Sequence, residues 1–278
     1  MLGHNGRVTT SAHPHAPAPR WASYVAVGDS FTEGLWDTDP AAPDRCRGWA
    51  DRLAASLSAR RVTAGEEPLR YANLAVRGKL LGPIIADQLP RALDLEPGLV
   101  SLVGGGNDIL RPRADVDALS ATLEDAVVRV RATGADVLVA TGFDTAESPV
   151  VSLTRSRVGV YDTNVWSIAR RHGAYVLDLW GMRALKDWRM WAPDRIHLTD
   201  DGHRRVADAA LVGLGLPPDD AAWDEPLPLL PRERFADRAR GNARWAREYV
   251  GPWVGRRLRH ESSGDGRAAK YPDFTDWT

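Results

Sequence analysis

Short apolar runs alternate with longer amphipathic stretches along most of the chain from residue 23 onward. A run that is apolar on both faces is typical of a strand in a parallel sheet that helices cover on both sides. The pattern predicts strands at 24–27, 71–75, 100–103, 137–141 and 175–179. It predicts helices at 48–60, 79–88, 116–133, 154–172 and about 200–214. This alternation predicts the α/β class, as a three-layer α/β/α sandwich around a five-stranded parallel sheet.

The alternating pattern stops at both ends of the chain. Residues 1–22 contain Pro, Ala, His and Gly without an apolar run, so we expect a disordered leader and no secretory signal. Prolines mark an extended connector over 217–231, and 232–260 is typical of a helix rich in arginine. Residues 261–278 are expected to be disordered. We therefore predict one main domain over 23–216 with appendages.

Composition and charge exclude several classes of protein. The chain has 278 residues, 44% of them hydrophobic, and a formal net charge of −1, which gives the whole molecule no bias toward nucleic acid or anionic membranes. Its one cysteine, Cys46, excludes an intrachain disulfide and a multi-cysteine metal site. No apolar stretch reaches the roughly 18 residues of a membrane-spanning helix. We expect a cytoplasmic protein.

The arginine-rich segment has its own electrostatic character. Residues 231–260 contain nine arginines and three acidic residues, a local balance of +6. Trp245, Tyr249 and Trp253 stand at i, i+4 and i+8 spacing, although Pro252 should end or kink the helix. The simpler interpretation is that these aromatic side chains dock on the main domain while the arginines stay solvated. The alternative is a binding site for an acidic partner, nucleic acid or a membrane surface.

A serine follows directly after the first predicted strand. The apolar run stops at Gly28, and Ser30 stands where a helix would begin. A hydroxyl at the carboxyl end of a parallel strand lies at the edge where ligands bind, beside N–H groups that can stabilise an anion. Ser30 is therefore a candidate nucleophile, although serine is also a common N-cap at such a junction. Thr32 stands where the G-x-S-x-G elbow needs its second glycine, which excludes that signature.

Two of the seven histidines lie in the loop-like stretch that follows the last predicted strand. Asp194 precedes His197 by three residues, on a turn opened by Pro193. A carboxylate in this position can accept the Nδ1–H of the imidazole and leave Nε2 free to act as a base. His203 falls within the following helical pattern and is the weaker candidate for the base.

Two further segments end predicted strands at the same edge of the sheet. Gly78 follows the second strand, and Asn107 follows a run of three glycines after the third. Acyl transfer needs donors that point at the oxyanion, and the N–H groups of Ser30 and Gly78 together with the Asn107 amide can supply three. The glycine run is also compatible with a tight turn or a phosphate loop, but Ile109 occupies the last glycine position of G-x-G-x-x-G.

These four segments, in this order and at strand ends, resemble the SGNH hydrolase superfamily, also called GDSL-type esterases and lipases. The resemblance covers roughly 23–215 and rests on GDSF at 28–31, Gly78 after Asn73, GGND at 105–108 and DRIH at 194–197. Phe31 replaces the leucine of the usual G-D-S-L block, a change that we expect to affect packing only.

The resemblance implies a flavodoxin-like fold without a metal or organic cofactor. It also implies Ser30 as nucleophile, Asp194 and His197 as the acid–base pair, and Ser30, Gly78 and Asn107 as the oxyanion donors. We therefore predict a serine ester hydrolase whose partner is a small-molecule ester. Nothing in the chain resembles a long apolar lid or a membrane-binding helix, which favours short acyl groups. Candidate substrate contacts near the predicted site are Asp29, Trp36, Arg77, Trp188 and Trp191.

Two other classes of protein compete with this prediction. Asp29, Asn107, Asp108, Asp194 and His197 have the chemistry of metal ligands in a phosphoesterase, but the chain lacks H-x-H and G-N-H-D/E patterns. A non-catalytic protein would keep the fold and bind an acidic partner through 232–260. The sequence leaves open the physiological substrate, the choice between hydrolysis and acyl transfer, and the oligomeric state.

Overall fold

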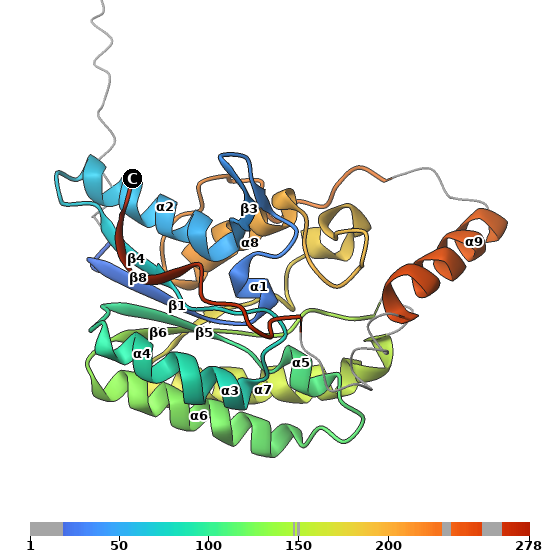
Figure 1. Ribbon diagram of the computed structural model, residues 1–278, viewed down its shortest axis with the longest axis horizontal. Coiled ribbons are helices and arrows are strands. Elements are labelled where there is room, and N and C mark those ends of the chain that lie inside the picture. Colours follow the sequence, from blue (N-terminus) through green and yellow to red (C-terminus); the bar gives the residue numbers. More distant parts are fainter. Residues whose placement is uncertain (1–18, 147, 149–150, 230–234, 252–262) are drawn as a thin grey trace, which may run out of the picture.

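A six-stranded sheet in the order β7-β6-β5-β1-β4-β8 forms the centre of the protein (Figure 1). The computed structural model describes residues 19–146, 148, 151–229, 235–251 and 263–278. Five strands run parallel: β1 (Ser23–Gly28), β4 (Leu69–Asn73), β5 (Leu99–Val103), β6 (Asp136–Ala140) and β7 (Tyr175–Leu177). Their chain order across the sheet is 2-1-3-4-5, the flavodoxin-like arrangement. The predicted α/β/α class and all five predicted strands are confirmed.

Helices cover both faces of the sheet (Figure 1). One layer contains α2 (Gly48–Thr63) and α8 (Asp200–Gly213), which pack against each other. The other contains α3 (Leu81–Pro83), the π-helix η1 (Ile84–Gln88), α4 (Leu89–Asp94), α6 (Val116–Ala132) and α7 (Arg155–His172). The predicted helix at 79–88 is therefore a short α-helical turn continued by a π-helix, and a further helix follows it.

The alternation of side chains along β1 creates two apolar cores. Tyr24 and Ala26 are buried in the core beneath α2 and α8. Val25 and Val27 are buried in the core beneath α6 and α7. Because successive side chains of a strand point to opposite faces, a run that is apolar at every position packs against both helix layers. This arrangement leaves the carboxyl edge of the sheet for polar residues.

The prediction of a purely parallel, five-stranded sheet is wrong at one edge. β8 (Tyr271–Trp277) pairs antiparallel with β4, so the prediction of a disordered segment over 261–278 is wrong for these residues. Pro272 and alternating polar residues hide this strand from a pattern search, but both are tolerated on an edge strand. A short hairpin of β2 (Thr38–Asp39) and β3 (Ala42–Cys46) was also not predicted.

The main domain begins earlier than the predicted boundary after residue 22. Trp21 is buried, and its Nε1 donates to Asp136 Oδ2 at 2.7 Å. Arg20 donates to the same carboxylate oxygen at 2.5 Å. Residues 1–18 of the predicted leader lie outside the described part of the chain. The end of the leader is therefore part of the folded domain.

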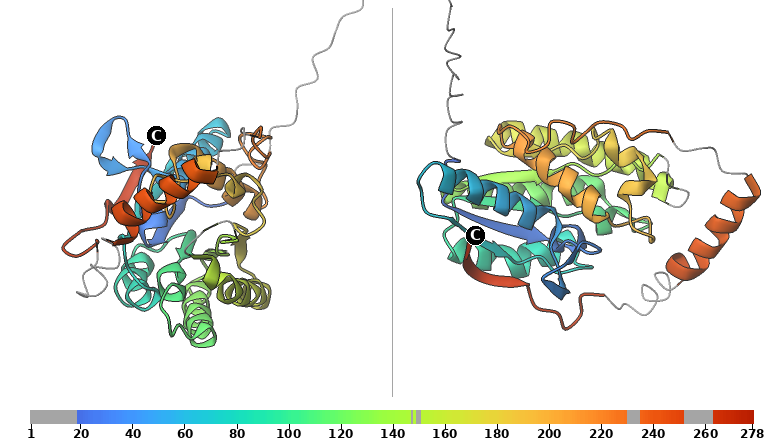
Figure 2. Two further views of the ribbon diagram at one scale, coloured as in Figure 1. Left: turned by 90° about the vertical axis from the view of Figure 1, so that its right-hand side faces the viewer. Right: turned by 90° about the horizontal axis from the view of Figure 1, so that it is seen from above.

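The arginine-rich segment contains α9 (Phe235–Trp245) and a π-helical turn, η5 (Ala246–Val250). The helix lies beyond the carboxyl edge of the sheet and crosses in front of the main body when the protein is viewed from that side (Figure 2). The remaining parts of the predicted helix, with Trp253, fall outside the described residues. None of the helices in the described ranges is long and apolar enough to cross a membrane.

Candidate active site

Ser30 begins a four-residue helix, α1 (Ser30–Glu33), directly after β1. Asp29 is the N-cap, and its Oδ1 accepts the N–H of Phe31 at 3.1 Å. A Cβ at Gly28 would lie 2.7 Å from the carbonyl oxygen of Val103, so only glycine fits where β1 turns into α1. This turn places the Ser30 hydroxyl at the carboxyl edge of the sheet, as the sequence predicted.

A tight turn brings His197 to this hydroxyl. His197 Nε2 lies 2.9 Å from Ser30 Oγ, and Nδ1 lies 2.7 Å from Asp194 Oδ2. The other oxygen, Asp194 Oδ1, accepts the N–H groups of Ile196 and His197, each at 3.0 Å. Arg195 has φ +57°, a left-handed conformation that costs a non-glycine residue roughly 1 kcal/mol. Ser30, His197 and Asp194 therefore form one continuous chain of hydrogen bonds.

The carboxyl group of Asp194 is held in its charged form. Burial raises its pKa, but the hydrogen bond and charge of His197 and the two backbone N–H groups outweigh this effect, and the pKa lies below its usual value. Trp36 adds a further hydrogen bond, because its Nε1 donates to Asp194 Oδ2 at 2.7 Å. A charged carboxylate at Nδ1 favours the tautomer in which Nε2 is free to accept a proton.

The two other predicted oxyanion donors line the same cavity as Ser30. Gly78 has φ +75°, a conformation that glycine adopts without strain. The Asn107 side chain is fixed by two hydrogen bonds from Nδ2, to Asp29 Oδ2 at 3.1 Å and to the carbonyl oxygen of Lys79 at 3.0 Å. Both N–H groups of the Asn107 amide are therefore engaged within the protein.

Asp29 has a structural contact where the sequence suggested a substrate contact. Its carboxyl group is buried beneath Ser30 and accepts the Asn107 amide. Burial raises the pKa of Asp29 to about 6, against the opposing effect of the Phe31 N–H. Asp29 thereby connects the N-cap of α1 to the Asn107 side chain.

The cavity around Ser30 has a volume of about 690 Å³. Apolar and aromatic side chains from several strand-end loops supply much of its wall. They include Leu80, Leu110, Phe143, Val158, Leu185 and Trp191. Tyr249 of η5 and Ser263 also line it, so residues beyond the main domain contribute to the cavity. This apolar wall suits the acyl or alcohol part of an ester.

The three predicted tryptophans all line the cavity, but two of them also form hydrogen bonds within the protein. Trp36 has φ 77° and donates to Asp194. Trp191 donates from Nε1 to the carbonyl oxygen of Leu185 at 2.7 Å and packs edge-on against Phe143. Trp36 and Trp188 are 43% and 39% exposed. Both therefore keep free surface that a substrate could contact.

Arg77 lines the cavity, but its guanidinium is engaged by Glu33 of α1. Arg77 Nε donates to Glu33 Oε1 at 2.8 Å, Nη2 donates to the same oxygen, and the Arg77 N–H donates to Oε2 at 2.7 Å. The hydrogen bonds of Glu33 raise the pKa of the guanidinium further. The side chain thereby fixes the loop before Gly78 and is committed to an internal partner.

His203, the weaker candidate for the base, is buried in the core. Its Nε2 lies 3.3 Å from the carbonyl oxygen of Leu35, and its ring stacks on Phe31. Burial lowers its pKa to about 4. His203 does not line the cavity, so among the histidines that the structure describes, His197 is the one that reaches the serine.

Trp245 of α9 contacts the site, and the sequence did not predict this contact. Its spacing predicted docking on the main domain, and it is indeed buried there. Its Nε1 donates to the carbonyl oxygen of Asp194 at 3.0 Å. The docking surface is thus the turn that carries the acid–base pair, and nothing in the local sequence signals this target.

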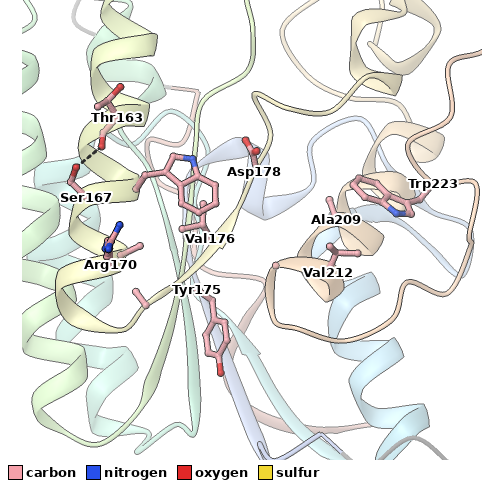
Figure 3. A pocket seen from close by; sticks show the side chains of 13 residues that line it. Thr163, Ser167, Arg170, Tyr175, Val176, Asp178, Ala209, Val212 and Trp223 are labelled. Atoms are coloured by element: carbon pink, nitrogen blue, oxygen red, sulfur yellow. Dashed lines mark hydrogen bonds between the residues drawn. The ribbon is translucent and has the colours of Figure 1, made fainter.

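A second, larger cavity of about 930 Å³ lies between α7, β7 and α8 (Figure 3). Trp166, Val176, Val212 and Trp223 line it. Its serine, Ser167, donates to the carbonyl oxygen of Thr163 at 2.9 Å, and no histidine is among the described residues that line the cavity. These described residues therefore include no pair of a nucleophile and a base.

The part of the chain that the structure describes contains no cluster of three or more His, Cys, Asp or Glu side chains arranged to bind a metal ion. The polar groups at the strand ends instead bond to one another, as in the Asp29–Asn107 and Asp194–His197 pairs.

The flavodoxin-like sheet and the polar strand ends at its carboxyl edge define a hydrolase of the α/β/α type. Residues 26–205 match the model of the GDSL-like Lipase/Acylhydrolase family, and the chain belongs to this family. It is therefore an enzyme that hydrolyses ester bonds. The match ends before α9 and β8.

Solved structures share the fold. LAE5, an alpha/beta hydrolase enzyme from the metagenome of Lake Arreo in Spain, is 24% identical with a TM-score of 0.58, over 70% of this chain and 95% of its own. Axe2, an acetylxylan esterase from Geobacillus stearothermophilus, is 21% identical with a TM-score of 0.58, over 70% and 94%. TesA is 23% identical with a TM-score of 0.54, over 69% and 97%. No curated protein matches the chain significantly.

Proposed function

We propose that the protein is a serine ester hydrolase in which Ser30 is the nucleophile, His197 the base and Asp194 the carboxylate that orients it. The observation that carries the proposal is the chain of hydrogen bonds from Ser30 Oγ to His197 Nε2 and from His197 Nδ1 to Asp194 Oδ2, of 2.9 and 2.7 Å, beside an apolar cavity. The same spatial arrangement of serine, histidine and carboxylate operates in serine hydrolases of unrelated folds.

The reaction follows from these contacts. As Ser30 Oγ attacks the ester carbonyl carbon, its proton passes to His197 Nε2, and the carbonyl oxygen becomes an oxyanion. The N–H groups of Ser30 and Gly78 stabilise that oxyanion, and the Asn107 amide joins them by exchanging its hydrogen bond to the Lys79 carbonyl oxygen for one to the oxyanion. When the tetrahedral intermediate collapses, the bond to the leaving oxygen breaks and His197 returns the proton to the alcohol. Water then attacks the acyl-enzyme by the same steps and releases the acid and Ser30.

We propose short acyl groups as the preferred substrates. The sequence has no long apolar lid, and Phe31, Phe143 and Trp191 pack against one another along the cavity wall that follows Ser30. A series of chromogenic esters from acetate through butyrate and octanoate to laurate tests this preference. We expect kcat/KM to be highest for acetate or butyrate, and a maximum at octanoate or laurate would contradict it.

The proposal of Ser30 as nucleophile is tested by replacing it. Ser30→Ala should abolish ester turnover, whereas a chelator should leave the turnover of the wild type unchanged. Loss of activity with EDTA and recovery with a divalent cation would favour the metal-dependent phosphoesterase that the acidic residues suggested.

Exposed arginines of α9 and η5 support a proposed role in binding an acidic partner, separate from the reaction. Arg244 of α9 and Arg247 of η5 are exposed, on either side of Trp245, which is buried against the main domain. Binding of a model polyanion such as heparin to the full chain, lost at high salt and weakened by Arg244→Gln with Arg247→Gln, tests this role. Equal binding by the variant would contradict it.

A further inference from the structure

The turn that carries Asp194 and His197 has an unusual backbone at Arg195. Its φ of +57° directs the N–H groups of Ile196 and His197 toward Asp194 Oδ1. A non-glycine residue adopts this conformation against a steric cost, so contacts elsewhere must hold it in place. The geometry of the acid–base pair therefore depends on what holds Arg195.

Helix α9 supplies those contacts from outside the main domain. Arg195 Nη1 donates to Asn242 Oδ1 at 2.7 Å. The guanidinium also lies over the ring of Trp245, 5.0 Å from its centroid, and over that of Trp188, at 5.6 Å. Trp245 Nε1 donates to the carbonyl oxygen of Asp194 at 3.0 Å. Two side chains of α9 thus hold two consecutive residues of the turn.

The hydrogen bond between Trp245 and Asp194 is protected from water, and the one between Arg195 and Asn242 is partly buried. Trp245 is 8% exposed, and the hydrogen bond from its indole is buried. A buried hydrogen bond and a guanidinium stacked between two aromatic rings are stronger and more directional than their exposed counterparts. The contact between α9 and the turn therefore has the features of a fixed part of the site.

We propose that α9 is a working part of the active site, in which Trp245 and Asn242 are positioning residues that hold the Asp194–His197 turn in its reactive shape. They act through Arg195 and the Asp194 carbonyl and do not touch the reacting atoms. This inference rests on the proposed serine mechanism. It assigns a role in the reaction to a segment that lies beyond the family match at 26–205.

The test compares Trp245→Phe, Asn242→Ala and the double variant with the wild type, all as full chains. Phenylalanine keeps the aromatic ring but removes the N–H donor. Small displacements of a reacting group cost from about tenfold to about a hundredfold in rate, so we expect kcat to fall by about tenfold in each single variant and further in the double variant. KM for a small acetate ester should stay within about twofold, because the cavity wall is unchanged. Phosphonylation of Ser30 by a fluorophosphonate should slow in parallel.

Two further variants separate positioning from simple stabilisation. Ala243→Gln, at an exposed position of the same helix, is the matched control and should keep the wild-type kcat. Arg195→Gly adopts the left-handed conformation without strain and needs less support. Adding it to the double variant should therefore recover part of the lost kcat, which a purely structural role of α9 would not produce.

A kcat of the folded double variant within about twofold of the wild type would overturn the inference, and so would the absence of any recovery with Arg195→Gly. If the wild type itself shows no reaction that depends on Ser30, the proposed mechanism fails and the inference fails with it. If the wild type reacts through Ser30 and the double variant reacts equally fast, the inference alone fails.

Discussion

The carboxylate of Asp194 receives hydrogen bonds on both oxygens, and one of these donors is the imidazole of the proposed base. His197 Nδ1 and Trp36 Nε1 share Oδ2, while two backbone N–H groups share Oδ1. Trp36 is held there in a left-handed conformation, with φ 77°. A strained residue bonded to a charged group of the site is expected to serve that group.

Replacing Trp36 with phenylalanine removes one donor from Asp194 Oδ2. The less compensated carboxylate stabilises the protonated imidazole, so the acid limb of the kcat/KM profile should move to higher pH, and kcat should fall by about tenfold. Steady-state kinetics across the pH range measures both effects. Trp166→Phe, in the second cavity, is the control. An unchanged pH profile would show that Trp36 has no part in positioning Asp194.

Asn107 is the proposed oxyanion donor with the clearest expected magnitude. Removal of one side-chain donor of this kind costs about a hundredfold or more in kcat in other hydrolases. We therefore expect Asn107→Ala to lower kcat by roughly a hundredfold while the protein stays folded. Asn164→Ala removes an amide that bonds to Ser120 between two helices, and it should leave kcat unchanged. A loss below about threefold in Asn107→Ala would remove the amide from the oxyanion hole.

His203 predicts a dependence of stability on pH. Its pKa is lowered to about 4 by burial, so in the folded protein it stays neutral where the unfolded chain binds a proton. Since the unfolded state then holds more protons, the free energy of unfolding falls as the pH drops below about 6.5. Between pH 7 and about 5 this group should remove ~2 kcal/mol.

Urea unfolding of the wild type and of His203→Phe at both pH values measures this effect. The variant should lose less stability on acidification by about that amount, since other acid-sensitive groups are common to both proteins. Its ester turnover should persist, because His203 does not reach Ser30. An equal loss of unfolding free energy on acidification in the wild type and in His203→Phe would contradict the proposed neutral, buried state of His203.

At the level of elements, the sequence predicts the strands and helices that have a regular apolar pattern. The strand runs of β1 and β5 are apolar on both faces because helices cover both sides of the sheet, and this pattern can be recognised in the sequence. Strand β8 has no such signal, because an edge strand needs neither two apolar faces nor a free N–H at every position. It is fixed by contacts with residues about two hundred positions earlier, which no local pattern contains.

Lys270, just before β8, supplies the strongest of those contacts. Its Nζ donates to Asp51 Oδ2 at 2.8 Å and to the carbonyl oxygens of Glu33, Cys46 and Arg47. Both charged side chains are buried. Removing one partner of a buried ion pair leaves the other charge without compensation, which typically costs about 3 kcal/mol or more.

We therefore expect Lys270→Met to lower the free energy of unfolding by about 3 kcal/mol. Adding Asp51→Asn should recover part of this loss, because the uncompensated charge is removed. Denaturant unfolding of the wild type, Lys270→Met, Asp51→Asn and the double variant completes this double-mutant cycle. A loss below about 1 kcal/mol in Lys270→Met would show that β8 is not anchored by this ion pair.

The predictability of the site follows the same rule. Ser30, Gly78, Asn107 and His197 each follow a strand or its loop, and the carboxyl ends of parallel strands meet at one edge, so their approach could be foreseen. The contacts of Trp36 and Trp245 with Asp194 join segments that no periodicity relates. The sequence equally could not show that Glu33 engages the guanidinium of Arg77.

At the scale of the whole molecule, the reaction depends on parts contributed by most of the chain. The proposed nucleophile lies directly after β1, the proposed oxyanion donors follow β4 and β5, and the proposed acid–base turn precedes α8. Helix α9 then closes on that turn from outside the sandwich (Figure 2). The proposed mechanism requires that these parts together make Ser30 a nucleophile.

The most direct test of this claim is intact-mass measurement after incubation with a fluorophosphonate, on the wild type and Ser30→Ala, beside turnover of a short-chain chromogenic ester with and without EDTA. The account predicts a single adduct on the wild type, none on Ser30→Ala, and turnover that survives the chelator. An equal adduct on Ser30→Ala, or turnover that persists without Ser30, would contradict it.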